Sequence, residues 1–61
     1  MKILTTTTFG RPVSFNCHLI SRVEEYVSDN QKTYIYNGNE MVGTIVDMPY
    51  LEVVGFLKAI E

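Results

Sequence analysis

Residues 32–46 read KTYIYNGNEMVGTIV, two β-prone segments separated by a short Asn-Gly-Asn turn. Aromatic and β-branched residues favour strands, and Asn with Gly between two such segments is a strong local signal for a β-hairpin. We therefore expect strands over residues 32–36 and 40–46, with the chain reversing near Gly38.

Two registers of this hairpin compete. With Gly38-Asn39 as the loop, Ile35 faces Val42 and Tyr36 faces Met41. The alternative loop, one residue earlier, places a glutamate opposite Ile35 and loses an apolar pair. We favour the first register because it brings like side chains together across the strands.

The segments before this hairpin also read as strands. Residues 2–9 include four consecutive threonines, which favour extended backbone, and the Gly-Arg-Pro step at residues 10–12 predicts a turn. Residues 12–17 alternate between apolar and polar side chains, and Asn16 can bond local backbone and end that strand. Residues 21–27 alternate as well and are expected to form a further strand.

The C-terminal segment has helical periodicity. Over residues 48–60 the apolar positions form an unusually wide face, and polar or small residues recur every third position, at Glu52, Gly55, Lys58 and Glu61. Asp47 is a suitable N-cap, and Pro49 suits the first turn of a helix. The sequence thus predicts one α+β domain over residues 1–61: a small antiparallel sheet of four to five strands followed by a C-terminal amphipathic helix.

Composition excludes several classes of protein. The 61 residues carry five Lys and Arg against seven Asp and Glu, a net charge of −2, which argues against nucleic-acid binding. The single cysteine, Cys17, cannot form an intrachain disulfide or a cysteine-rich metal site. No stretch is long enough to span a membrane, and without a secretory signal we expect a cytoplasmic protein with no metal and no cofactor.

The size of the chain favours self-association. A domain of about 60 residues buries only about 60% of the surface of its unfolded chain, so its stability is marginal. The wide apolar face of the expected helix exceeds what one small sheet can cover. We therefore expect a homo-oligomer, with another protein as a further partner.

The order of several short motifs along the chain resembles that in the FlbD-like family of small flagellar-associated proteins. The resemblance spans nearly the whole chain, and the residues that carry it are Ile3-Leu4-Thr5, Gly10-Arg11-Pro12-Val13, Asn16, Leu19-Ile20, Val23-Glu24, Thr33-Tyr34-Ile35, Asn37-Gly38 and Glu52-Val53-Val54. Where that family carries a Lys-Glu-Ser step before its helix, this chain has residues 46–49, Val-Asp-Met-Pro. The resemblance implies the same small α+β fold and a non-enzymatic role.

The candidate binding surface is aromatic. Tyr34 and Tyr36 share one face of their expected strand, and Tyr26 stands on a neighbouring strand. Tyrosine and methionine are enriched in protein interfaces, so we expect these side chains and Met41 to bind a partner or a second copy. On the helix, three apolar residues are divided between core and interface: Leu51, Val54 and Phe56.

The alternative function is a protein that sequesters a small anionic molecule, such as a nucleotide, at a subunit interface. Its candidate ligands are Arg11, Arg22 and Lys32. An enzyme is not expected: neighbouring side chains on a strand point to opposite faces, so neither Cys17 with His18 nor the adjacent pair Glu24-Glu25 can act together.

Overall fold

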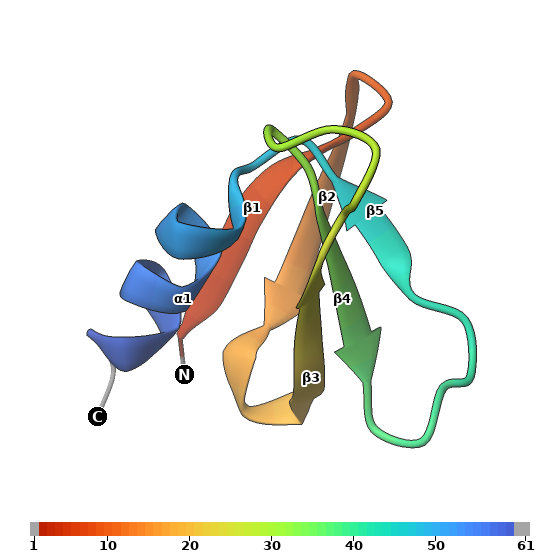
Figure 1. The fold of residues 1–61 in the computed structure, drawn as a ribbon. Helices are drawn as coiled ribbons and strands as arrows, with labels where there is room; N and C mark the ends of the chain where they lie inside the picture. Colours follow the sequence, from red (N-terminus) through yellow and green to blue (C-terminus); the bar gives the residue numbers. More distant parts are fainter. Residues whose placement is uncertain (1, 60–61) are drawn as a thin grey trace.

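The computed structural model describes residues 2–59 (Figure 1). In chain order the elements are β1 (Ile3–Thr8), β2 (Arg11–Asn16), the 3-10 helix η1 (Cys17–Leu19), β3 (Ile20–Glu25), β4 (Thr33–Asn37), β5 (Thr44–Val46) and α1 (Tyr50–Lys58). The predicted α+β class is confirmed. The strands form two antiparallel sheets, β1-β2 and β3-β4-β5, instead of one.

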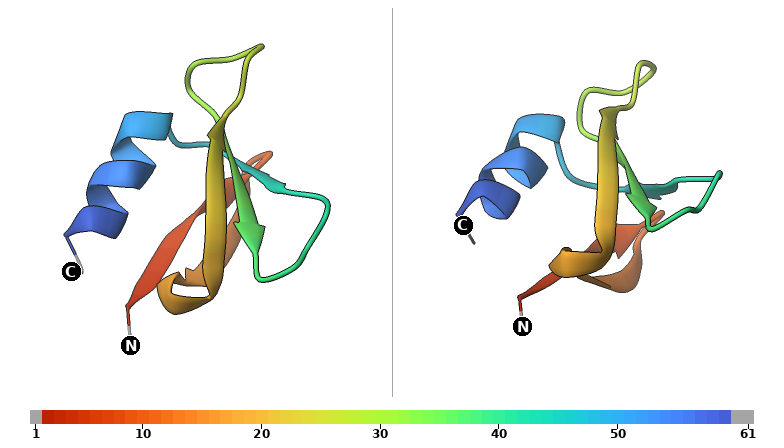
Figure 2. Two further views of the ribbon diagram at one scale, coloured as in Figure 1. Left: turned by 60° about the horizontal axis from the view of Figure 1, so that its bottom comes forward. Right: turned by 90° about the horizontal axis from the view of Figure 1, so that it is seen from below.

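The two sheets meet where β5 lies beside β1. There the backbone N–H of Asp47 donates to the carbonyl of Thr7 at 2.8 Å. In both views of Figure 2 the helix lies on the β1 and β3 side of the molecule, away from β5. This arrangement leaves the outward face of the β3-β4-β5 sheet uncovered by the helix.

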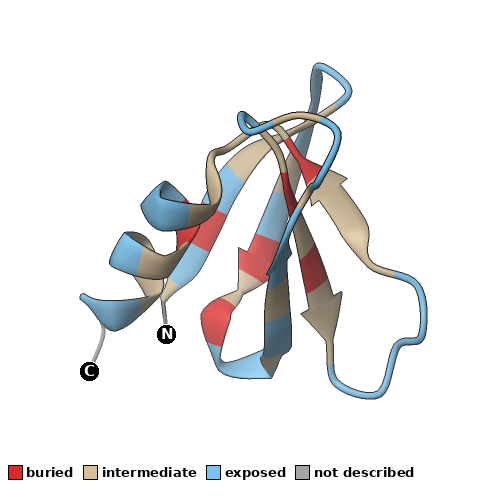
Figure 3. Ribbon diagram, viewed as in Figure 1, coloured by how far each residue is buried: buried red, intermediate tan, exposed pale blue. Residues whose placement is uncertain are grey.

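A small core lies between the two sheets and the helix (Figure 3). Both sheets and α1 contribute to its buried apolar side chains, which are Leu4, Phe15, Cys17, Ile35, Val46 and Val53. Along β4 the buried positions alternate with partly exposed ones: Thr33 and Ile35 point into the core, so Tyr34 and Tyr36 point outward.

The turn of the first hairpin differs from the expected one. The reversal takes place at Phe9-Gly10, with φ of 50° and 81°. Gly10 thus lies in a turn as predicted, but Arg11 and Pro12 belong to β2, so the predicted span of residues 10–12 is wrong. Two consecutive residues with positive φ form the mirror-image turn that matches strand twist in tight hairpins. This turn sets the register that pairs Leu4 with Phe15, both of which lie in the core.

The register of the second hairpin also differs. Ile35 pairs with Thr44 and Thr33 with Val46, so the predicted pairing of Ile35 with Val42 is wrong by two residues. The observed register buries Val46 completely in the core. It also lets the Thr33 hydroxyl donate to the carbonyl of Met48 at 2.7 Å. Tertiary burial thus outweighs the pairwise preference, and the predicted strand over residues 40–46 shortens to its last three residues.

The helix is confirmed over a shorter range. α1 spans Tyr50–Lys58, whereas the sequence predicts a helix over residues 48–60. Residue 60, and Glu61 of the predicted polar positions, lie outside the described residues. Pro49, predicted within the first turn, is the N-cap and offers no side-chain cap, so the prediction that Asp47 caps the helix is wrong. Asp47 faces the β1–β2 turn instead.

The link between the two sheets begins as predicted. The Asn16 side-chain oxygen accepts from the backbone N–H of His18 at 3.0 Å and ends β2. The next residues form η1, in which Cys17 is buried and His18 exposed. The two side chains therefore do not share a site.

Candidate functional site

The outward face of the β3-β4-β5 sheet is aromatic. We call it the tyrosine face and define it by Arg22 and Glu24 of β3, Tyr26 directly after β3, and Tyr34 and Tyr36 of β4. The alternation of the strands determines its composition, because every second residue of β3 and β4 faces outward.

The three tyrosine rings form a continuous row. The ring centroids of Tyr26 and Tyr34 are 5.2 Å apart, and those of Tyr34 and Tyr36 are 6.2 Å apart. Both spacings lie within the range of interacting aromatic pairs. The predicted grouping of these side chains on one face is therefore confirmed, while their role in binding stays a prediction.

Tyr36 is held in place from both sides. The Arg22 guanidinium lies 4.1 Å from the ring centroid, and the Tyr36 hydroxyl donates to Glu24 Oε1 at 3.2 Å. On Gly43 a Cβ atom would lie 2.9–3.1 Å from ring atoms of Tyr36, closer than ordinary van der Waals contact. Gly43 thus provides the slot into which the ring fits.

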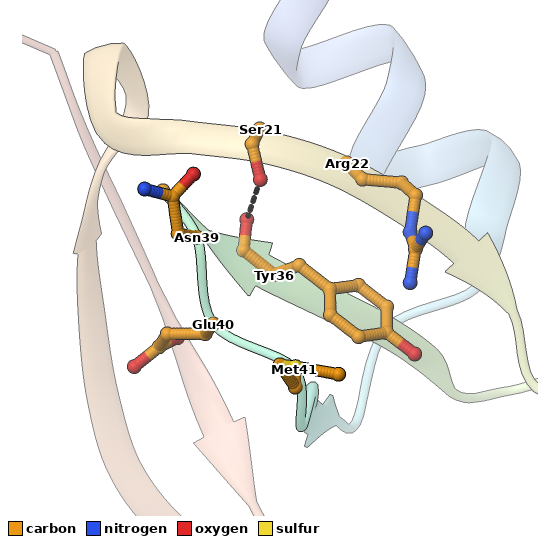
Figure 4. Close-up of a pocket in the computed structure, with 7 residues that line it drawn as sticks. Ser21, Arg22, Tyr36, Asn39, Glu40 and Met41 are labelled. Atoms are coloured by element: carbon orange, nitrogen blue, oxygen red, sulfur yellow. Dashed lines mark hydrogen bonds between the residues drawn. The ribbon is translucent and has the colours of Figure 1, made fainter.

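A pocket of about 450 Å³ opens at the Tyr36 end of this face (Figure 4). Its lining includes Ser21, Arg22, Tyr36, Asn39, Glu40 and Met41. The Ser21 hydroxyl donates to the carbonyl of Tyr36 at 3.3 Å and joins β3 to β4 at the rim. Met41 is 91% exposed and lies in the loop between β4 and β5. It does not pair with Tyr36 as predicted, but both side chains line the same pocket.

One positive and two negative side chains lie at or beside the pocket. Arg22 Nε lies 3.4 Å from Glu24 Oε2, and both side chains are about half exposed, so the pair contributes little to stability. Glu40 adds a further carboxylate to the rim. Among the described residues that line the pocket, Arg22 is the one cation, and it already faces a carboxylate.

Lys32 belongs to the opposite end of β4, beside the β1–β2 turn. Its ammonium pairs with Asp47 Oδ1, while Asp47 Oδ2 accepts from the Thr7 hydroxyl at 2.7 Å and from the Gly10 N–H at 3.1 Å. The hydrogen bond from Lys32, followed by those from Thr7 and Gly10, holds the pKa of Asp47 well below its usual range. The same bond raises the pKa of Lys32.

The three cations predicted to bind an anion are therefore not gathered in one site. Arg22 lies opposite Tyr36, Lys32 lies at the other end of the β3–β4 ladder opposite Tyr26, and Arg11 begins β2 beside the hairpin turn. Arg22 and Lys32 each face a carboxylate of the same chain. The Arg22–Glu24 pair follows from the sequence, because the two residues lie two positions apart on one face of a strand. The Lys32–Asp47 pair has no such local sign, because the two residues are 15 positions apart.

The predicted helix residues lie apart from the tyrosine face. Phe56 is half-buried, packs against the core, and has the Lys2 ammonium 5.1 Å from its ring centroid. Leu51 is 79% exposed, and Val54 is half-buried. Of these three residues, Phe56 packs against the core and Leu51 is on the surface, while their predicted part in an interface stays a prediction. The helix α1 does not extend the aromatic row.

Sequence reasoning missed Phe9, which is 71% exposed at the tip of the first hairpin with the Lys32 ammonium 5.3 Å from its ring centroid. The signal that could have found it is the Gly at position 10, since a tight two-residue turn often ends in glycine. That signal gives the turn but not the exposure of the ring.

Within residues 2–59, His, Cys, Asp and Glu side chains nowhere form a group of three that could hold a metal ion. No helix in this part of the chain has the length and apolar character needed to cross a membrane. Comparison of the chain with models of protein families, with curated proteins and with solved structures found no match, so the FlbD-like resemblance stays a prediction.

Proposed function

We propose that this protein is a small non-enzymatic adapter that acts by protein–protein binding through the tyrosine face, and that it associates with itself. The observation that carries the proposal is the continuous row of three tyrosine rings beside a pocket with the exposed Met41. Tyrosine, methionine and arginine are the residue types enriched in interfaces and at their energetic centres.

The structure of the face supports this proposal over a purely structural role for the tyrosines. The core lies on the other side of the sheet, so the rings are not needed to fill it. Arg22, Gly43 and Glu24 fix the Tyr36 ring before any partner arrives. A surface whose side chains are ordered in advance loses less conformational entropy on binding.

The arrangement of cations favours a protein partner over the alternative of a small anionic ligand. Arg22 is the only cation of the tyrosine face, and Glu24 lies beside it. Binding of nucleic acid is disfavoured for the same reason, since phosphate contacts need several uncompensated Lys or Arg side chains. A protein interface needs no such excess of positive charge.

Self-association is supported by the size of the core. Six buried apolar side chains within residues 2–59 are a small core for a domain that has no disulfide. Domains of this size commonly gain stability from oligomerisation. The family resemblance also supports a binding role, because it implies no catalytic residues.

The test is the solution mass of the protein over a dilution series. Wild type is expected to exceed the monomer mass of 7.0 kDa at high concentration, and Tyr34→Ser is expected to weaken association about tenfold. Thr5→Ser, on the exposed surface of the β1–β2 hairpin, is the matched control and should associate like wild type. A wild type that remains monomeric throughout would refute self-association.

A further inference from the structure

The tip of the first hairpin has a backbone conformation that its residue type disfavours. Phe9 has a φ of 50°. A bulky side chain is an outlier in this left-handed region, where Asn, Asp and Gly are preferred. Phe9 is also 71% exposed, so packing within the chain does little to offset the strain. Strained residues that persist in this way concentrate at binding sites.

The tip is held by hydrogen bonds as well as strained. The Gly10 N–H and the Thr7 hydroxyl both donate to Asp47 Oδ2, at 3.1 and 2.7 Å, so the backbone is fixed on either side of Phe9. The Lys32 ammonium lies 5.3 Å from the centroid of the Phe9 ring and pairs with the same carboxylate. The aromatic ring is therefore presented outward on a support that is already ordered.

A complementary pocket lies at the opposite end of the same molecule. In Figure 1 the β1–β2 tip and the loop between β4 and β5 are at opposite ends of the sheets. The pocket beside that loop contains the Tyr36 ring, the Met41 thioether and the Arg22 guanidinium. Each of these groups attracts an aromatic ring, by ring–ring, sulfur–aromatic and cation–π contact respectively. Its volume of about 450 Å³ accommodates one aromatic side chain.

The charges at the two ends are also complementary. Arg11 follows the tip directly and is exposed, and Glu40 is exposed at the rim of the pocket. Within residues 2–59 neither side chain forms an ion pair, whereas Lys32 and Arg22 are each paired with a carboxylate. One uncompensated positive charge thus accompanies the ring, and one uncompensated negative charge accompanies the pocket.

We propose that the Phe9–Arg11 tip of one copy of this chain inserts into the pocket of Arg22, Tyr36 and Met41 on a second copy, where Arg11 pairs with Glu40. This inference rests on the proposed self-association and names its contact. Each copy carries one tip and one pocket, so the two sides of the contact are different surfaces.

Complementation between two defective variants tests this contact. Phe9→Asn removes the ring and suits the left-handed backbone, and Met41→Glu damages the pocket at an exposed position, so both variants should fold. Each alone should associate at least about tenfold more weakly than wild type. A one-to-one mixture should form a dimer, because the Met41→Glu copy supplies an intact tip to the intact pocket of the Phe9→Asn copy.

A charge exchange gives a second readout. Arg11→Glu and Glu40→Arg should each weaken association, and the double variant should restore it, since the two charges meet again with signs reversed. Val27→Asn is the matched control: Val27 is 96% exposed but belongs to neither surface, so association should not change. Thermal unfolding followed by circular dichroism verifies that every variant is folded.

The outcomes separate this inference from the proposed function. A mixture of Phe9→Asn and Met41→Glu that stays monomeric overturns the tip-to-pocket contact, as does a Phe9→Asn variant that associates like wild type. If Tyr34→Ser still weakens association in that case, the proposed function stands and only the contact is wrong. A monomeric wild type overturns both.

Discussion

The β1–β2 and β4–β5 hairpins of this protein differ in how soon strand pairing resumes after the turn. Asn37-Gly38 has the composition of a tight turn, and the chain does turn there, because Gly38 has a φ of 51° and the Glu40 N–H donates to the carbonyl of Asn37 at 2.9 Å. The next strand, β5, nevertheless begins only at Thr44. Phe9-Gly10 has an unfavourable first residue, yet it forms the tight turn with positive φ at both positions. The difference teaches that contacts outside the turns, and not the turn residues alone, determine how soon strand pairing resumes after each chain reversal.

The contacts differ in kind at the two turns. At the first, Asp47 binds the backbone of Gly10 and the hydroxyl of Thr7 and holds the turn closed. At the second, burial of Val46 sets a register in which residues 38–43 are left over. The first turn is held by polar contacts to a distant residue, whereas at the second the burial of Val46 separates the turn from the start of β5.

The largest effect on stability is expected at Val46, whose burial sets the register of the β4–β5 hairpin. Val46→Ala should cost about 2 kcal/mol through lost burial and the cavity left behind. Val42→Ala is the matched control, because Val42 is 81% exposed in the observed register and should change stability by less than about 0.5 kcal/mol. Urea denaturation measures both. Equal losses would indicate that Val42, and not Val46, pairs into the core.

The next largest effect is expected at Asp47, and it depends on pH. Because the folded protein lowers the pKa of this carboxyl, its contribution is fully present above the ordinary value of 3.8 and is lost as pH falls below that value. Thermal unfolding between pH 6 and pH 2 should show a steeper acid loss in wild type than in Asp47→Asn. Parallel curves for the two proteins would contradict the assigned hydrogen bonds.

A smaller effect, of opposite sign, is expected at the strained tip. Phe9→Asn should stabilise the monomer by about 1 kcal/mol, because Asn tolerates positive φ better than Phe. Phe9→Leu keeps the strain and serves as the control, with little gain expected. Melting temperatures at low protein concentration, where self-association does not contribute, measure the difference. Destabilisation by Phe9→Asn would show that the ring supports the fold.

The smallest effect on stability is expected at Gly43, in the loop between β4 and β5. Gly43→Ala would place a Cβ 2.9 Å from Tyr36 Cζ, but the contact is with the far end of a side chain that can move. The loss of stability should stay below about 1 kcal/mol, while the Tyr36 ring shifts relative to Arg22. Ring proton chemical shifts of Tyr36 report that movement; unchanged shifts would mean that Gly43 does not form the slot.

Much of the fold follows from local patterns. The alternation over residues 12–17 and 21–27 predicts strands that the structure contains with small changes of boundary, and the shared face of Tyr34 and Tyr36 follows from the period of two. The site was less predictable. Lys32 pairs with Asp47, and Arg22 lies over the Tyr36 ring. Both contacts join residues far apart in the chain, so no local sequence pattern predicts them.

The sequence by itself determined the class of the fold, the strand face on which each residue lies, and the balance of charge. These depend only on residue type and on the short sequence periods of strands and helices. Only the tertiary structure decided the register of the second hairpin, the left-handed conformation of Phe9 and the partner of Asp47. Each of these follows from groups distant in the chain, a buried valine and a carboxylate with three donors, whose combined effect outweighs the preferences of the residues nearby.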